Sequence, residues 1–278
     1  MLYIFCALYD EAKPFIEKYN LSGNSEFHHY RVFTDWDGDD HGEGKILTIT
    51  GSGILKAAMA VTEICARVPP ARYDRLLNVG IAGTADEGTE IGDTFLVNRI
   101  IDDMTKKEYY PDIVYNPGVR EKTLCTVVTP GYFGDCLTDM EGAGIYAAGE
   151  KFFTADRMIF VKAVSDVGST ENVTRELIGK CTAALLKATE GMIEKNECML
   201  SSERSPEERV EQLAEDMRLS VTMKESMKQL FRFMILEGQD VSEMIDKVYR
   251  ENDMPVTSKI EGKRIYDGIY ETVFSYLR

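Results

Sequence analysis

The sequence is short of basic side chains, histidine, tryptophan and long apolar runs. Lys and Arg number 32 against 47 Asp and Glu, which gives a formal net charge of −15, and the 278 residues include three His and one Trp. Binding to nucleic acid or to an anionic membrane surface needs clustered basic side chains, so neither partner is expected. No apolar run approaches the roughly 20 residues of a membrane helix. We therefore expect small molecules or proteins as partners.

Cysteine and histidine also lack the spacing of metal or redox sites. The three histidines, at positions 28, 29 and 41, share one polar segment without a chelating partner. The apolar stretch 1–7 follows no basic leader and is expected to be a strand and not a signal peptide. We expect a cytoplasmic protein with reduced thiols, no metal and no organic cofactor. The six cysteines, none in a close pair, are Cys6, Cys65, Cys125, Cys136, Cys181 and Cys198.

Short β-rich runs alternate with helical patterns over residues 1–198. This alternation predicts an α/β fold with a central mixed, mostly parallel sheet flanked by helices. Strands are expected at 2–7, 45–50, 75–79, 93–101, 123–129 and 158–164, and helices at 10–17, 55–66, 140–152 and 173–195.

Beyond residue 198 the sequence has helical periodicity and no strand signal. A polar linker at 201–206 ends in Pro206, which suits the first turn of a helix. We expect residues 199–278 to form an all-helical C-terminal extension, with an apolar helix around 230–235 and others at 241–249 and 260–277. It could pack on the first domain, cover a pocket, extend a dimer interface or bind a partner; simple packing is favoured.

Glycines follow two predicted strands. Gly51 and Gly53 come after the second strand, and Gly80 and Gly83 come after the third. Glycine at a strand end lets backbone amides approach a ligand closely, although a plain tight turn explains the same residues. The spacing is neither that of a phosphate loop nor that of a dinucleotide fingerprint.

Carboxylates occur just beyond other predicted elements. Glu11 and Asp166 follow predicted strands, and Glu141 begins a helix rich in small residues. Strand ends of an α/β sheet converge on one crevice, so these acids could share a site. Each acid alone is explained equally well as a helix charge or a cap.

The ordered set of motifs favours a shared site. In order they are Ala7-Leu8-Tyr9-Asp10-Glu11, Gly51-Ser52-Gly53, Asn78-Val79-Gly80-Ile81-Ala82-Gly83, Ile91-Gly92-Asp93, Asp139-Met140-Glu141-Gly142-Ala143 and Ala163-Val164-Ser165-Asp166. Over residues 1 to about 195 this set resembles the nucleoside phosphorylase and nucleosidase superfamily, in particular the methylthioadenosine/S-adenosylhomocysteine nucleosidases. The resemblance implies a homodimeric N-glycosidase that hydrolyses a purine nucleoside, such as a 5'-modified adenosine.

The resemblance also implies roles for individual residues. Asp166 is the expected general acid at purine N7, and Glu11 is the expected base that activates water. Glu141 would hold the ribose hydroxyls while Met140 packs against the ribose. Such an arrangement suits glycoside hydrolysis, which needs an acid at the leaving group, a base at the nucleophile and negative charge near the sugar. The substrate site is further expected to include Ser165, Gly80 and Ile81.

Two departures from the superfamily pattern bear on the nucleophile and the base. Asn78 replaces the arginine usual in the phosphorylases, and Ile81 replaces a serine or threonine, so water is favoured over phosphate. The stretch 128–139 is shorter than in the nucleosidases, where it supplies an aromatic that stacks on the base; Tyr132 or Phe133 could take that place. The alternatives are a phosphorylase, a futalosine-type nucleosidase and a non-catalytic nucleoside-binding protein.

Overall fold

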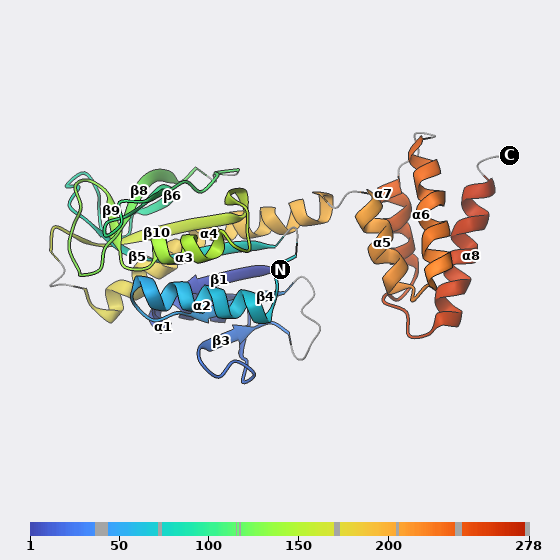
Figure 1. The fold of residues 1–278 in the computed structure, drawn as a ribbon, viewed down its shortest axis with the longest axis horizontal. Coiled ribbons are helices and arrows are strands. Elements are labelled where there is room, and N and C mark those ends of the chain that lie inside the picture. The colour runs from blue at the N-terminus through green and yellow to red at the C-terminus, as the bar shows by residue number, and fades with distance from the viewer. Residues whose placement is uncertain are drawn as a thin grey trace. The chain divides into compact units, whose positions relative to one another are not determined.

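The computed structural model describes residues 1–36, 44–71, 74–114, 116, 118–169, 173–203, 206–236 and 241–275. The chain divides into two compact units, Met1–Asn196 and Glu197–Arg278 (Figure 1). The first unit has an α/β fold, and the second consists of helices. None of the helices in the described parts of the chain is long and apolar enough to cross a membrane.

A mixed sheet forms the centre of the first unit. Its open arm runs β2-β3-β4-β1-β5, and β5 also pairs with both β10 and β9. Because β10-β6-β8-β9 returns to β5, these five strands close into a barrel. The strands are β1 (Leu2–Cys6), β2 (Ser22–Gly23), β3 (Arg31–Thr34), β4 (Lys45–Ile49), β5 (Arg75–Thr84), β6 (Thr94–Asp102), β7 (Glu108–Tyr109), β8 (Arg120–Thr126), β9 (Leu137–Asp139) and β10 (Met158–Val167).

The predicted α/β fold with a mixed sheet is confirmed, but the sheet is less parallel than expected. The parallel pairs are β1–β4, β1–β5, β5–β10, β6–β8 and β8–β9. Five further pairs are antiparallel: β10–β6, β2–β3, β3–β4, β5–β9 and β6–β7. Short strands such as β2, β7 and β9, which the hydrophobic pattern did not predict, contribute three of the antiparallel pairs.

Helices cover both faces of this sheet. Along β1, Tyr3 and Phe5 pack with α2 and α3, whereas Ile4 and Cys6 pack with α1 and α4. A strand buried on both faces reads as a continuous apolar run, which is why β1 was evident from the sequence. The helices are α1 (Tyr9–Lys18), α2 (Ile54–Arg67), α3 (Gly142–Gly149) and α4 (Arg175–Glu203).

Several boundaries differ from the sequence prediction. Strand β5 extends to Thr84 and β10 extends to Val167, so Gly80, Gly83 and Asp166 lie inside strands and not beyond them. Both strands are longer than predicted because they pair with each other along almost their whole length. Helix α4 continues to Glu203, past the helix end predicted at 195 and past residue 199, where the second unit was expected to begin.

The second unit contains α5 (Pro206–Asp216), α6 (Val221–Leu236), α7 (Val241–Glu251) and α8 (Lys259–Ser275). Pro206 is the first residue of α5, as predicted. The four helices bury a core of their own, with Leu213, Met217, Met227 and Phe231 almost fully enclosed. Apolar residues of every helix in this unit therefore pack on the other helices of the same unit.

Candidate active site

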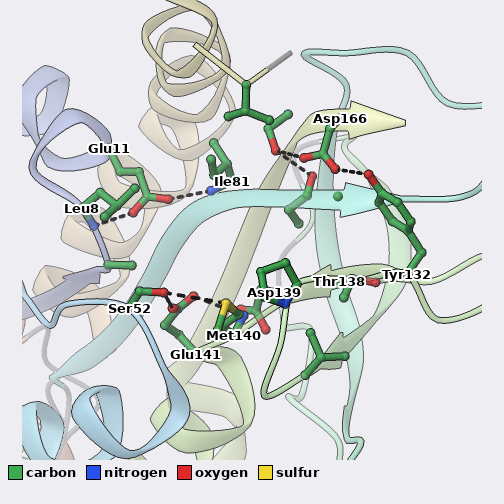
Figure 2. A pocket seen from close by; sticks show the side chains of 18 residues that line it. Leu8, Glu11, Ser52, Ile81, Tyr132, Thr138, Asp139, Met140, Glu141 and Asp166 are labelled. Atoms are coloured by element: carbon green, nitrogen blue, oxygen red, sulfur yellow. Dashed lines mark hydrogen bonds between the residues drawn. The ribbon is translucent and has the colours of Figure 1, made fainter. Parts of the chain in front are cut away.

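A pocket with a volume of about 230 Å³ lies where β5, β10 and β9 meet the starts of α1 and α3 (Figure 2). Segments from all along the first unit contribute to its wall. The lining residues are Ala7, Leu8, Glu11, Ser52, Ile81, Ala82, Gly83, Val127, Pro130, Gly131, Tyr132, Thr138, Asp139, Met140, Glu141, Ser165, Asp166 and Val173.

Glu11 is held by two backbone amides. Its Oε2 accepts a hydrogen bond from the Leu8 N–H at 2.8 Å, and its Oε1 accepts one from the Ile81 N–H at 2.9 Å. The residue is 2% exposed. Burial raises the pKa of Glu11, and the two amides together with Lys162 oppose that rise only in part. A buried carboxylate with a raised pKa is a stronger base than an ordinary glutamate.

Glu141 lies directly before α3 and has a similar environment. Its Oε1 accepts hydrogen bonds from the Ser52 hydroxyl and the Gly53 N–H, both at 2.8 Å. Burial and then the charge of Asp139 raise the pKa of Glu141. The Gly51–Gly53 turn, in which both glycines have positive φ, thus brings an amide to a carboxylate of the protein itself.

A buried ion pair lies beside these two glutamates. Lys162 Nζ is 2.9 Å from Asp139 Oδ2, and both side chains are at most 2% exposed. Burial alone would lower the pKa of Lys162, but Asp139, Glu141 and Glu11 raise it by more, so this side chain remains an ammonium. Asp139 also accepts hydrogen bonds from the Thr126 hydroxyl and the Gly142 N–H. Lys162 is therefore surrounded by carboxylates, and Asp139 by an ammonium group and two hydrogen-bond donors.

Asp166 lies at an irregularity of β10. The pairing of β10 with β5 changes register between Val164 and Asp166, leaving Ser165 unpaired at a bulge. Bulges re-aim side chains, and here both Ser165 and Asp166 contribute to the pocket. The Ser165 hydroxyl donates to Asp166 Oδ1 at 2.5 Å, and the Tyr132 hydroxyl donates to Oδ2 at 2.6 Å. Figure 2 shows Asp166 and Tyr132 together, apart from Glu11.

Two glycines of β5 make room for these acids. A Cβ atom on Gly80 would lie 3.1 Å from Glu11 Oε1, and one on Gly83 would lie 2.6 Å from Asp166 Oδ2. The sequence left open whether these glycines bring backbone amides close to a ligand or form a plain tight turn. The glycines instead lie within a strand, where their lack of a side chain lets carboxylates cross its face.

The pocket brings together most of the residues that the sequence singled out, and two lie elsewhere. Gly80 does not line it but lies beneath Glu11. Phe133 is 40% exposed and packs under the Lys106 ammonium, so it is not the pocket aromatic. The aromatic ring in the wall belongs to Tyr132. The lining residues that were predicted are Glu11, Ile81, Tyr132, Met140, Glu141, Ser165 and Asp166.

Sequence reasoning missed Lys162, Asp139 and Ser52. The signal for Lys162 was a single charged residue inside the apolar run 158–164, where an unpaired lysine would be costly. Asp139 and Ser52 stood within the quoted motifs without an assigned role. Each completes the surroundings of a predicted glutamate, which only the folded arrangement reveals.

No Arg, Lys or His is among the described residues that line the pocket. Asn78, which the resemblance predicts to stand where the phosphorylases have an arginine, is 1% exposed and donates to the Phe5 carbonyl at 3.0 Å. Among the described residues, no cluster of three His, Cys, Asp or Glu side chains could hold a metal ion. His41 lies outside them.

Comparison with known proteins supports the resemblance. Residues 2–129 match the family model of the phosphorylase superfamily. No curated protein sequence matches the chain.

Solved structures give the fold. The 5'-methylthioadenosine/S-adenosylhomocysteine nucleosidase from Neisseria meningitidis, in complex with methylthio-immucillin-A, has a TM-score of 0.58 at 16% identity, covering 70% of this chain and 98% of its own. The 5'-methylthioadenosine nucleosidase from Arabidopsis thaliana has a TM-score of 0.59 at 18% identity, with coverages of 70% and 95%. A Chlamydia trachomatis nucleosidase bound to MTA has a TM-score of 0.55 at 20% identity, with coverages of 70% and 97%. The first unit of this chain therefore has the fold of these nucleosidases and, over residues 2–129, the sequence pattern of the phosphorylase superfamily, as its motifs predicted.

Proposed function

We propose that the protein is a purine nucleosidase that hydrolyses the N-glycosidic bond of a 5'-modified adenosine, such as methylthioadenosine or S-adenosylhomocysteine. One observation carries the choice of water over phosphate. The pocket wall contains the carboxyl groups of Glu11, Asp139, Glu141 and Asp166 and, among the described residues, no basic side chain. Such a wall repels a phosphate dianion, whereas it suits a cationic sugar transition state.

The proposed reaction gives a role to each of three acids of the pocket. The C1'–N9 bond breaks and its electron pair passes into the purine, while a proton moves from the Asp166 carboxyl to N7. A water oxygen forms the new bond to C1', and Glu11 takes the water proton. Glu141 accepts hydrogen bonds from the ribose hydroxyls and offsets the positive charge that develops on the sugar. The products are a free purine and a free sugar.

Lys162 balances the charge of this arrangement. Without it, Glu11, Asp139 and Glu141 would be three buried acids whose mutual repulsion favours their protonated forms. The Lys162 ammonium, in contact with Asp139 Oδ2 at 2.9 Å, lowers that repulsion. We infer that it keeps Glu11 available as a base at neutral pH.

The rest of the wall supports a substrate with an apolar 5' group. Thioether substituents pack well against apolar and thioether side chains. The larger aliphatic and thioether side chains in the lining are Leu8, Ile81, Val127, Met140 and Val173. Met140 is the one that we assign to the ribose and its substituent, because it adjoins Glu141.

We further propose that the protein acts in the cytoplasm as a homodimer. Cys6, Cys65, Cys125, Cys136 and Cys181 are free thiols, as in a reducing compartment. Leu55 and Met59, one turn apart on α2, are 75% and 64% exposed, an apolar pair suited to contact with a second copy. Light scattering of the purified protein tests this: a dimer that Leu55→Glu/Met59→Glu converts to a monomer is expected, and a wild-type monomer would contradict it.

A nucleoside panel tests the proposed substrate class. Methylthioadenosine, S-adenosylhomocysteine, adenosine, inosine and futalosine are each incubated with the enzyme, and release of the free base is measured. We expect adenine release to be fastest from the two 5'-thio nucleosides. Preferred cleavage of futalosine would reassign the substrate. Binding of nucleosides without release of any base would indicate a binding protein and overturn the proposal.

A further inference from the structure

Tyr132 contacts Asp166 through its hydroxyl and not through its ring face. The residue lies in the connection between β8 and β9, and its O–H donates to Asp166 Oδ2 at 2.6 Å (Figure 2). On the other side, the Ser165 hydroxyl donates to Asp166 Oδ1 at 2.5 Å. Each oxygen of this carboxyl group therefore has its own hydroxyl donor, while each retains a lone pair for another partner.

Gly83 makes the close approach of the two side chains possible. A Cβ atom there would lie 2.8 Å from Tyr132 Cε1 and 2.6 Å from Asp166 Oδ2, so any larger residue would push both side chains away. Strand β5 thus provides a flat surface over which the phenol ring reaches the carboxyl group. The contact is built by a strand, a bulge and a loop together.

The phenol remains a donor under all ordinary conditions. Burial, followed by the hydrogen bond to Asp166, raises the pKa of Tyr132 far above its usual value. The Tyr132 hydroxyl proton therefore points at the Asp166 carboxyl group both before and after Asp166 loses its own proton. A hydrogen bond to an ionised acceptor is about twice as strong as one to a neutral acceptor.

We propose that Tyr132 is a positioning residue for the acid step, whose hydroxyl holds the Asp166 carboxyl group and stabilises the carboxylate that forms as the proton moves to purine N7. This inference rests on the proposed function. The Tyr132 hydrogen bond strengthens as negative charge develops on Asp166, so it stabilises the transition state more than the bound substrate. Tyr132 thereby contributes to the rate and not to substrate affinity.

The test separates departure of the base from binding of the sugar. Tyr132→Phe removes the hydroxyl and keeps the ring, and it is assayed on two substrates with the same 5-methylthioribosyl group. One carries adenine, which leaves with a proton, and the other carries 4-nitrophenolate, which leaves without one. For the adenine substrate we expect kcat to fall about tenfold with KM changed by less than about twofold, because one charged hydrogen bond is lost. Turnover of the nitrophenyl substrate should be unchanged.

Tyr110→Phe is the matched control. The Tyr110 hydroxyl donates to Glu108 and the side chain is 54% exposed, away from the pocket lining. Its removal should leave both substrates unaffected.

Other results would overturn the inference. Equal losses on both substrates, or a rise in KM without a fall in kcat on the nucleoside, would reduce Tyr132 to a packing residue. An unchanged kcat on the nucleoside would remove it from the acid step. If the wild-type enzyme released no adenine at all, the proposed function itself would fail.

Discussion

The two ends of the pocket hold their acids in different ways. At one end, Glu11 accepts hydrogen bonds from the backbone amides of Leu8 and Ile81, and Glu141 accepts from the Gly53 amide and the Ser52 hydroxyl. At the other end, Asp166 accepts hydrogen bonds from two hydroxyl groups, those of Ser165 and Tyr132.

This difference has a chemical consequence. Backbone donors are fixed by the main chain that carries them, and each glutamate accepts from at least one such donor, so the glutamates keep their orientation throughout the reaction. Hydroxyl donors rotate and can follow a carboxyl group as it loses its proton. The fixed end suits a base and a sugar-binding acid, and the adjustable end suits an acid that changes its charge during each turnover.

Removal of the acid at the adjustable end should have the largest effect. Asp166→Asn keeps the shape of the side chain but supplies no acidic proton to N7, and general acid catalysis contributes about 10²–10⁴-fold. We expect kcat for adenine release to fall by about 10³-fold while the melting temperature stays close to that of the wild type. Asp135→Asn, an exposed change in the nearby β8–β9 connection, is the control. An Asp166→Asn protein with the wild-type rate would eliminate the acid role.

The ion pair beside the fixed end should matter most for stability. Lys162→Met leaves Asp139 buried without its counter-charge, and breaking a buried pair in this way costs about 3–5 kcal/mol of unfolding free energy. Lys106→Met breaks the exposed pair with Asp103, for which about 0–1 kcal/mol is expected. Urea denaturation measures both. Equal losses in the two variants would mean that the Lys162 pair is no more important than a surface contact.

Substitution of the base at the fixed end should reduce the rate less than loss of the acid. In Glu11→Gln one carboxylate oxygen becomes an NH₂ group. The side chain can then accept a hydrogen bond from only one of the amides of Leu8 and Ile81, and it is no longer basic. We expect kcat to fall about a hundredfold, within the range for a lost general base, with little change in KM. Steady-state kinetics on methylthioadenosine provide the measurement. A loss confined to KM would assign Glu11 to binding.

The pH profile should show the smallest and most specific effect. Because burial raises the pKa of Glu11, this group is protonated and inactive up to a higher pH than an ordinary glutamate. The wild-type kcat/KM should therefore decline on the acid side at a pH above the usual glutamate value of about 4.3. Glu11→Gln should lack this decline at its low residual rate. A decline that persists in the variant would belong to another group, with Glu141 the first candidate.

The sequence predicted the acids at both ends of the pocket, but it predicted the elements that carry the glutamates better than the bulge and the loop around Asp166. Glu11 and Glu141 lie next to helix starts, where a local pattern of acids, glycines and small residues indicates both the helix and the carboxylate. Phe5 and Ile4 mark β1 because a strand buried on both faces reads as an apolar run. These are local signals, and the structure bears out the elements that they predicted.

The aspartate end depends on long-range pairing that a linear pattern does not contain. The bulge at Ser165 exists because β10 pairs with β5, and the Tyr132 hydroxyl reaches Asp166 only because Gly83 lies between them. Phe133 and Tyr132 were indistinguishable as candidates in the sequence. Lys162 was hidden for a related reason, since its partner Asp139 comes from a three-residue strand.

The dependence of adenine release on inorganic phosphate tests the central claim most directly. Methylthioadenosine is cleaved in buffer with and without phosphate, and the sugar product is identified by phosphorus NMR. The proposed function predicts the same rate in both buffers and a free sugar that carries no phosphate. A rate that requires phosphate, together with a sugar 1-phosphate product, would contradict it and make the protein a phosphorylase.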